Sequence, residues 1–164
     1  MEIISAGWRM EYIENDSGGE CIFCARVEGC DDVEQLIVKR GKSAFVLMNR
    51  YPYTTGHLMV APYRHVATMS DLTEEEACEV MSLLAWCEGV LAKAINPDGF
   101  NVGINIGKCA GAGVPGHIHI HIVPRWEGDT NFMPVVSETK VLPEVLTDTY
   151  RKIKSAMGEG EQTG

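Results

Sequence analysis

Three histidines at strict two-residue spacing constrain the fold more than any other feature of this chain. His117, His119 and His121 alternate with isoleucines, so every second residue is an imidazole and every residue between them is apolar. Successive side chains of a β-strand point to opposite faces, and Ile fits a pleated strand well. The pattern therefore predicts a strand with three imidazoles on one face. Pro124 is expected to end the hydrogen-bonded ladder of this strand or to confine it to a sheet edge.

Two kinds of chemistry suit such a row of imidazoles. Alternating histidines on a strand can hold zinc with an open coordination position, or one imidazole can act as a nucleophile while its neighbours fix its tautomer. The flanking residues favour phosphoryl chemistry. The glycine-rich segment 107–116 lets backbone N–H groups approach an anion, and Arg125 can pair with a phosphate.

The histidine segment resembles the signature of the histidine triad (HIT) nucleotide-binding proteins, in which three histidines alternate with apolar residues. Residues 49–62 are similar to the ribose-contacting hairpin of that family, and residues 105–111 are similar to its phosphate-side loop. The likeness spans residues 20–135. Residues 124–132 and 141–149 are similar to the bacterial branch that includes diadenosine tetraphosphate phosphorylase.

Apolar periodicity and turn residues predict an α+β chain with one long helix. Thr73 and Glu76 can form a capping box at the start of a helix over residues 73–95. The apolar face of this helix is expected to comprise Ala77, Val80, Met81, Leu84, Cys87 and Leu91. Strands are expected over residues 35–40, 44–49, 57–61 and 100–106 and over the histidine segment, and a C-terminal helix over residues 142–156. The dipeptide Gly41-Lys42 between the first two strands suits a tight hairpin turn only moderately.

The resemblance implies the HIT-like fold, a mostly antiparallel five-stranded sheet with one long helix and a C-terminal helix. It also implies a homodimer formed by joining sheets. We expect a single HIT domain over residues 1–157, of which residues 1–20 form an N-terminal arm, and a disordered tail over residues 158–164.

Bulk properties narrow the partners and the location. The formal net charge of −9 argues against nucleic acid as a partner, because binding to its backbone needs a basic surface. No apolar run approaches the ~18 residues of a membrane span, and the first residues lack the features of a signal peptide. We therefore expect a cytoplasmic protein with reduced cysteines and no membrane partner.

Cys21 and Cys24 form a Cys-x-x-Cys motif that has three interpretations when taken alone: half of a zinc site, a redox dithiol, or two small buried residues. The redox interpretation lacks the thioredoxin-like βαβ setting that it requires. The resemblance to a zinc-bearing branch of the family implies a closed, structural zinc site. Its ligands would be Cys21, Cys24, His65 and His117. His117 would then bind metal, which leaves two histidines of the triad for chemistry.

The resemblance assigns the role of nucleophile to His119, the middle histidine of the triad, with His121 and His57 as further catalytic residues. It implies a covalent AMP–histidine intermediate. The residues expected to contact the nucleotide are Phe45, Leu47, Asn49, Asn105, Gly111, Gly113, His119, His121, Arg125 and Trp126. Two points stay open at this level. Either Phe45 and Leu47 or their neighbours on the other face can line the base pocket, and Asn49 can instead be a turn residue that ends a strand.

The expected activity is cleavage of the α-phosphate bond of dinucleoside polyphosphates such as diadenosine tetraphosphate, with phosphate or water as acceptor. Alternatives are a nucleoside phosphoramidase, a nucleotide-binding regulatory protein with little turnover, and a hydrolase that uses the triad as an open zinc site. Many relatives carry a Ser or Thr shortly before the first triad histidine. Residues 112–116 of this chain contain no hydroxyl, so backbone amides would have to take its place.

Overall fold

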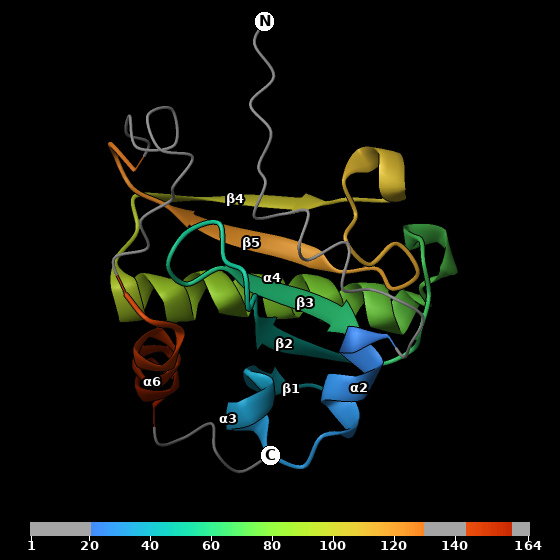
Figure 1. Cartoon of the computed structure of the whole chain (residues 1–164), viewed down its shortest axis with the longest axis horizontal. Helices are drawn as coiled ribbons and strands as arrows, with labels where there is room; N and C mark the ends of the chain where they lie inside the picture. Colours follow the sequence, from blue (N-terminus) through green and yellow to red (C-terminus); the bar gives the residue numbers. More distant parts are fainter. Residues whose placement is uncertain (1–20, 130–143, 159–164) are drawn as a thin grey trace, which may run out of the picture.

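The structure is a computed structural model that describes residues 21–129 and 144–158 (Figure 1). The elements are α2 (Ile22–Glu28), α3 (Asp32–Gln35), β1 (Ile37–Arg40), β2 (Ala44–Met48), β3 (Leu58–Pro62), η1 (Met69–Asp71), α4 (Glu74–Ile95), β4 (Gly99–Ile104), η2 (Lys108–Ala110), β5 (Ile120–Arg125) and α6 (Leu146–Ala156). The expected N-terminal arm over residues 1–20 lies outside the described residues. So does the expected tail, apart from Gly158.

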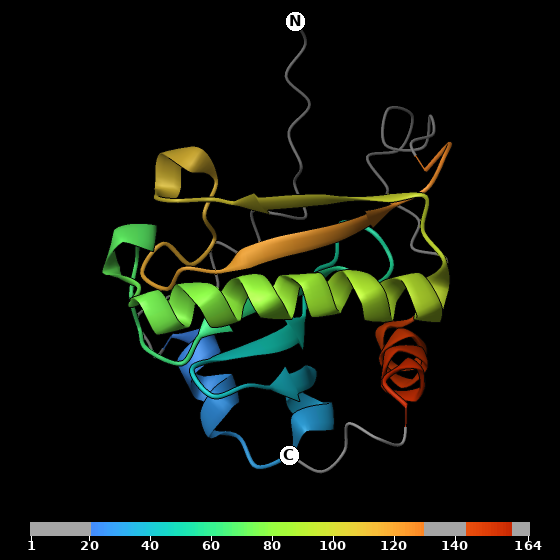
Figure 2. The same cartoon turned by 180° about the vertical axis from the view of Figure 1, so that it is seen from behind.

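The five strands form one sheet in the order β1-β2-β3-β5-β4, and every neighbouring pair is antiparallel. The long helix α4 runs along one face of this sheet, and Figure 2 shows it in front of the strands. The short helix α2 lies on the opposite face, as Figure 1 shows. The expected fold, an antiparallel five-stranded sheet with one long helix and a C-terminal helix, is confirmed.

Alternation along the strands divides the core into two clusters. Val46 and Met48 of β2 pack beneath α4, together with Val60 of β3. Phe45 and Leu47 of the same strand lie on the other face, where they pack with Phe23 of α2. The structure thereby answers which pair faces α2, because successive residues of β2 point to opposite faces.

Helix α4 begins as the sequence predicts. The Thr73 hydroxyl accepts from the Glu76 N–H, and the Glu76 carboxylate accepts from the Thr73 N–H, which completes the capping box. Four members of the expected apolar face are buried: Val80, Leu84, Cys87 and Leu91. The prediction was wrong for Ala77, which is exposed, and for Met81, whose exposed fraction is 65%. At about 100° per residue, Leu83 and Val90 lie nearer the centre of the buried face and take their place.

Strand β5 begins at Ile120, so His121 is the one triad histidine inside the regular strand. His117 and His119 lie in the extended segment that enters it. Pro124 does not end the strand, which continues to Arg125. Its pairing with β3 stops at Ile122, however, so at Pro124 the strand β5 has β4 as its single strand neighbour. The proline is therefore tolerated at a local edge of the sheet.

Two short helices near the start of the described chain were not foreseen. Cys21 is the N-cap residue of α2, and Asp31 caps α3 by accepting from the N–H groups of Val33 and Glu34. The C-terminal helix α6 begins at Leu146 rather than at residue 142, and residues 142–143 lie outside the described residues. Within the described chain, the length and hydropathy needed to cross a bilayer are met by no helix.

The turn between β1 and β2 is held by a residue of α4. The Glu79 carboxylate accepts from the N–H groups of Lys42 (2.7 Å), Ser43 and Ala44 (3.1 Å), and from the Ser43 hydroxyl. A Cβ atom on Gly41 would lie 2.5 Å from a Glu79 carboxylate oxygen, so this position requires glycine. The carboxylate thus satisfies the backbone donors that the turn leaves without strand partners.

Arg64 links the start of α4 to the segment that follows β3. Its guanidinium donates to the Glu76 carboxylate through Nε (2.6 Å) and Nη2 (2.5 Å), and to the carbonyl of Asp71 (2.8 Å). The hydrogen bond from Arg64 is the main cause that lowers the pKa of Glu76 to about 2.

This lowered pKa predicts a pH-dependent contribution to stability. A carboxylate with a depressed folded-state pKa stabilises the fold above its unfolded-state pKa, and the contribution is lost as the pH falls through the folded-state value. Glu76→Gln should therefore lower the free energy of unfolding by about 1–3 kcal/mol near pH 7. The difference from the wild type should shrink between about pH 4.3 and about pH 2. Urea unfolding across this range measures it, with the exposed neighbour substitution Glu75→Gln as control. A constant difference would contradict the assignment.

Candidate active site and metal centre

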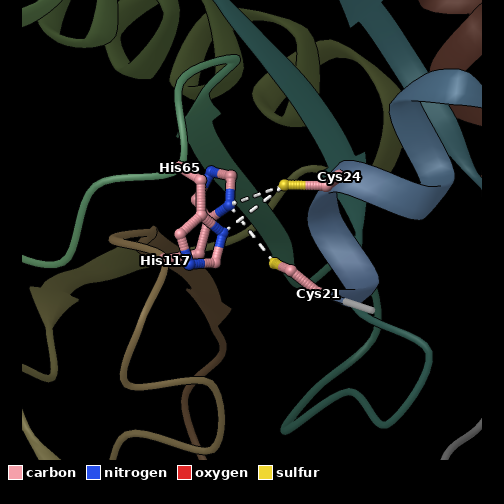
Figure 3. A group of neighbouring side chains, drawn as sticks. All are labelled: Cys21, Cys24, His65 and His117. Atoms are coloured by element: carbon pink, nitrogen blue, oxygen red, sulfur yellow. Dashed lines mark hydrogen bonds between the residues drawn. The ribbon is translucent and has the colours of Figure 1, made fainter. Parts of the chain in front are cut away.

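Two thiols and two imidazoles from distant parts of the chain converge beside α2. Cys21 and Cys24 lie at the start of that helix, His65 follows β3, and His117 precedes β5. The four ligand atoms all lie within 4.8 Å of one another, and their side chains point toward one another in Figure 3. Nδ1 of His117 lies 3.3 Å from the Cys21 sulfur and 3.6 Å from the Cys24 sulfur. Nδ1 of His65 lies 3.5 Å from the Cys24 sulfur.

The surroundings of this cluster suit a metal ion. His117 donates from Nε2 to the carbonyl of Pro62 (2.9 Å), which leaves the lone pair of Nδ1 facing the sulfurs. A hydrogen bond of this kind, made by the ring nitrogen that does not face the metal, fixes the tautomer of metal-binding histidines. Burial lowers the pKa of His117, which favours the neutral imidazole that a metal requires. The structure thus brings together all four residues that the sequence assigned to metal, and these residues could hold a metal ion.

His65 is placed by its neighbours in sequence and in space. The preceding residue, Arg64, is bound to the start of α4. Gly116 lies against the imidazole, and a Cβ atom there would be 3.2 Å from Nε2 of His65. A glycine at 116 therefore allows the loop before the triad to approach the metal cluster.

His119 is held in one tautomer by the backbone. Its Nδ1 donates to the carbonyl of His117 (2.8 Å), so the lone pair of the ring lies on Nε2. The side chain is buried, and this burial lowers the pKa of His119. A neutral imidazole with an available lone pair is the nucleophilic form.

His57 and His121 form a second hydrogen-bonded chain. The N–H of Tyr53 donates to Nδ1 of His57 (3.1 Å), so the proton of His57 lies on Nε2. That Nε2–H donates to Nδ1 of His121 (2.9 Å), which places the proton of His121 on its own Nε2. The ring centroids of His119 and His121 are 4.9 Å apart. The site therefore sets an imidazole lone pair beside an imidazole N–H donor.

Comparison with known proteins agrees with this geometry. Residues 31–128 match the family model described as the HIT domain. The chain is 46% identical over 152 residues to a Mycobacterium tuberculosis protein named AP-4-A phosphorylase, covering 88% of this chain and 78% of that protein.

The chain belongs to the HIT family.

Two further relatives broaden the comparison. One is the asymmetrical bis(5'-nucleosyl)-tetraphosphatase of Schizosaccharomyces pombe, which is 34% identical over 90 residues and covers 55% of this chain and 49% of that protein. The other is the crystal structure of a Zn-bound histidine triad family protein from Mycobacterium smegmatis. It has a TM-score of 0.63 and 25% identity, and the match covers 84% of this chain and 93% of that one.

Some residues expected to bind a nucleotide in this HIT protein lie on the face of the triad. Phe45 and Leu47 share the sheet face of Met59, which pairs with His121 across β3 and β5. Asn49 lies at the end of β2, where its Oδ1 accepts from the N–H of Tyr51 (2.9 Å) and its Nδ2 lies 3.4 Å from Nδ1 of His57. Asn49 thus acts as a turn residue in this structure and also lies within hydrogen-bonding distance of His57.

The loop over residues 105–111, which was expected to lie beside the phosphates, is closed by its own hydrogen bonds. Asn105 donates from Nδ2 to the carbonyl of Gly111 (3.4 Å). The N–H groups of Ala110 and Ala112 donate to the carbonyl of Gly107 (3.2 Å each), and that of Gly111 donates to the carbonyl of Lys108 (3.0 Å). These three amides are used within the loop. Gly113 lies in the connection from the loop to the triad.

Arg125 and Trp126 are not brought to the histidines within the chain. Arg125 lies four residues beyond His121, about 13 Å along the strand. Its guanidinium binds the Asp129 carboxylate with two hydrogen bonds (2.5 and 2.6 Å) and the Asn101 side chain with a third (2.9 Å). Trp126 donates from its indole nitrogen to the carbonyl of Asn96 (3.2 Å). The assignment of both residues to the nucleotide stays a prediction.

Three groups that shape the site were not predicted from the sequence. They are the ring of Phe23, the N–H of Tyr53 and the carbonyl of Pro62. Two of them are backbone atoms, which a side-chain pattern does not reveal. Phe23 stands between the two cysteines, and that position was its one available signal.

Proposed function

We propose that this HIT protein cleaves dinucleoside polyphosphates, with diadenosine tetraphosphate as the preferred class of substrate and phosphate as the acceptor. The names of the M. tuberculosis and S. pombe relatives support this activity. The structural observation that carries it is the hydrogen bonding of two neighbouring rings, whose centroids are 4.9 Å apart. His119 donates from Nδ1, which leaves a lone pair on Nε2, and His121 accepts at Nδ1, which leaves its proton on Nε2.

The proposed reaction has two displacements at the α-phosphorus. Nε2 of His119 attacks the α-phosphorus, the bond to the bridging oxygen breaks, and ATP leaves as an anion whose oxygen accepts a hydrogen bond from Nε2–H of His121. An oxygen of inorganic phosphate then attacks the AMP–histidine, the bond between phosphorus and Nε2 breaks, and ADP leaves with the neutral imidazole of His119 restored. Water in place of phosphate would give AMP instead.

His119→Ala should abolish the covalent intermediate while the protein still binds AMP. His121→Ala should still form the adduct, with a rate lower by about 10²–10³-fold, the usual cost of removing a hydrogen-bond donor that stabilises developing charge. Acid-quenched mass spectrometry of enzyme mixed with diadenosine tetraphosphate maps the adduct. Products formed with and without phosphate then distinguish ADP from AMP. An adenylyl group on another residue, or substantial turnover by His119→Ala, would refute this mechanism.

Asn49→Ala should weaken the binding of AMP by about 1–3 kcal/mol, because polar groups of the ribose and of the site would lose their partner. Calorimetric titration with AMP measures this effect. Ser82→Ala on α4, whose exposed hydroxyl donates to the carbonyl of Cys78 within the same helix, is the control. Equal affinity of the two variants would show that the ribose binds elsewhere.

We also propose that the metal of this chain is zinc, held by Cys21, Cys24, His65 and His117. The donor set supports this choice, since two thiolates and two imidazoles make a closed tetrahedral site of the structural kind. The Zn-bound M. smegmatis neighbour supports it as well. When bound, zinc would fasten the start of α2 to the segment after β3, which carries His65, and to the segment before β5, which carries His117.

Metal analysis of the purified protein should find one zinc per chain. Cys24→Ser and His65→Ala should lower the zinc content, whereas Cys30→Ser, which changes an exposed cysteine outside the cluster, should not. Structural zinc contributes about 10–16 kcal/mol of binding energy in small peptides, so chelation should also lower the melting temperature. Zinc-free protein with reduced Cys21 and Cys24 would exclude the proposal.

Two further proposals concern assembly and location. We propose a homodimer joined through β4, because this strand forms one edge of the sheet and the side chain of Val102 is 56% exposed on it. A free edge of this kind is suited to pairing with another strand. We propose a cytoplasmic location, because none of the six cysteines, all of which lie in the described residues, forms a disulfide, and thiolate ligands need a reducing compartment.

A further inference from the structure

Phe23 stands between the two cysteines of the metal cluster, and its ring packs against His119. The centroid of the Phe23 ring lies 4.7 Å from that of His119, with 34° between the planes. It lies 5.1 Å from that of His117, with 44° between the planes. These distances are in the range of favourable contacts between aromatic rings. Phe23 of the cysteine loop therefore packs its ring against the proposed nucleophile.

The hydrogen bond to the backbone does not by itself orient the His119 ring. The bond from Nδ1 to the carbonyl of His117 fixes one corner of the imidazole, but the direction of Nε2 depends on the plane of the ring. Two ring contacts set this plane. His121 meets His119 nearly edge-on, with 73° between the planes, and Phe23 packs against the ring at the shallower angle.

Phe23 is held in place by the cysteine loop and by the core. Helix α2 has seven residues, too few to be stable alone. The Phe23 side chain is 1% exposed and packs with Phe45 and Leu47. Cys21 and Cys24 flank it and reach toward His117, so a metal bound by the cluster would fasten the first turn of the helix on both sides of Phe23.

We propose that Phe23 is a positioning residue for His119. The loop from Cys21 to Cys24 holds its ring against the imidazole, and this contact keeps the Nε2 lone pair aimed at the phosphorus. Phe23 makes or breaks no bond. The catalytic consequence rests on the proposed nucleotidyl transfer, but the orientation of His119 can be measured without a substrate.

The first test is spectroscopic and uses zinc-loaded, full-length protein at one pH. Long-range ¹H–¹⁵N correlation spectra report the tautomer of each histidine. Wild type and Phe100→Leu should show His119 as a single Nδ1–H form. The control is apt because Phe100 packs against the cluster beneath α4, on the other face of the sheet. Without the Phe23 ring, the imidazole can turn out of the plane in which Nδ1–H meets the carbonyl of His117. Phe23→Leu should therefore show His119 as a mixture of tautomers or broadened by exchange. A single Nδ1–H form in Phe23→Leu, or a different form in the wild type, would overturn the proposal.

The metal content of each sample is measured, because loss of metal could change the His119 signal in the same way as loss of the Phe23 ring. If Phe23→Leu binds no zinc, Phe23→Met carries the same expectation, since methionine fills irregular space in a core but presents no ring. A His119 signal unchanged by this variant would equally overturn the proposal.

The second test is kinetic. Phe23→Leu should form the covalent AMP adduct about 10–100-fold more slowly in a single turnover, the scale of a small misplacement of a reacting group. Its affinity for AMP should stay within about threefold of the wild type, because only the transition state is affected. Reduced affinity with an unchanged rate of adduct formation would overturn the proposal and assign Phe23 to nucleotide binding. If the wild type forms no adduct, the proposed function fails, and the spectra alone decide the role of Phe23.

Discussion

His117 is the residue on which the rest of the site depends, because its side chain and its backbone serve two different centres. Nδ1 faces the sulfurs of Cys21 and Cys24, and Nε2–H is bound to the carbonyl of Pro62 at the end of β3. The carbonyl of the same residue accepts from Nδ1 of His119. A shift of His117 would therefore alter the metal cluster and the tautomer of the proposed nucleophile together. The regular strand begins only at Ile120, which leaves His117 free to adopt this position.

The positions of His121 and His57 depend on the register of the sheet and not on the cluster of cysteines and histidines. His121 lies in β5 opposite Met59 of β3, and this register brings it to His57, just before β3 begins. The N–H of Tyr53 then fixes which nitrogen of His57 carries the proton. One backbone amide thus determines two tautomers in series, because each imidazole can donate from only one nitrogen while it is neutral.

The predictions that succeeded rest on local rules. The capping box of Thr73 and Glu76 involves residues three apart in the chain, and the two faces of β2 follow from simple alternation. The prediction failed for Met81, because the centre of a buried helix face depends on what packs against it. The ring of Phe23 and the carbonyl of Pro62 depend on contacts between segments far apart in sequence. The four residues that could hold a metal ion were assigned through the family resemblance, since spacing alone does not connect Cys21 with His117.

The Glu79 contact with the turn between β1 and β2 determines which substitutions this hairpin can accept during evolution. Its turn residues are only moderately suited to a tight hairpin by themselves, and a carboxylate 35 to 37 residues away supplies the acceptors for its backbone N–H groups. Backbone amides are common to every residue except proline. Many residues can therefore replace Lys42 as long as Glu79 and Gly41 remain. The conformation of this turn depends on a residue of helix α4 more than on the side chain of Lys42.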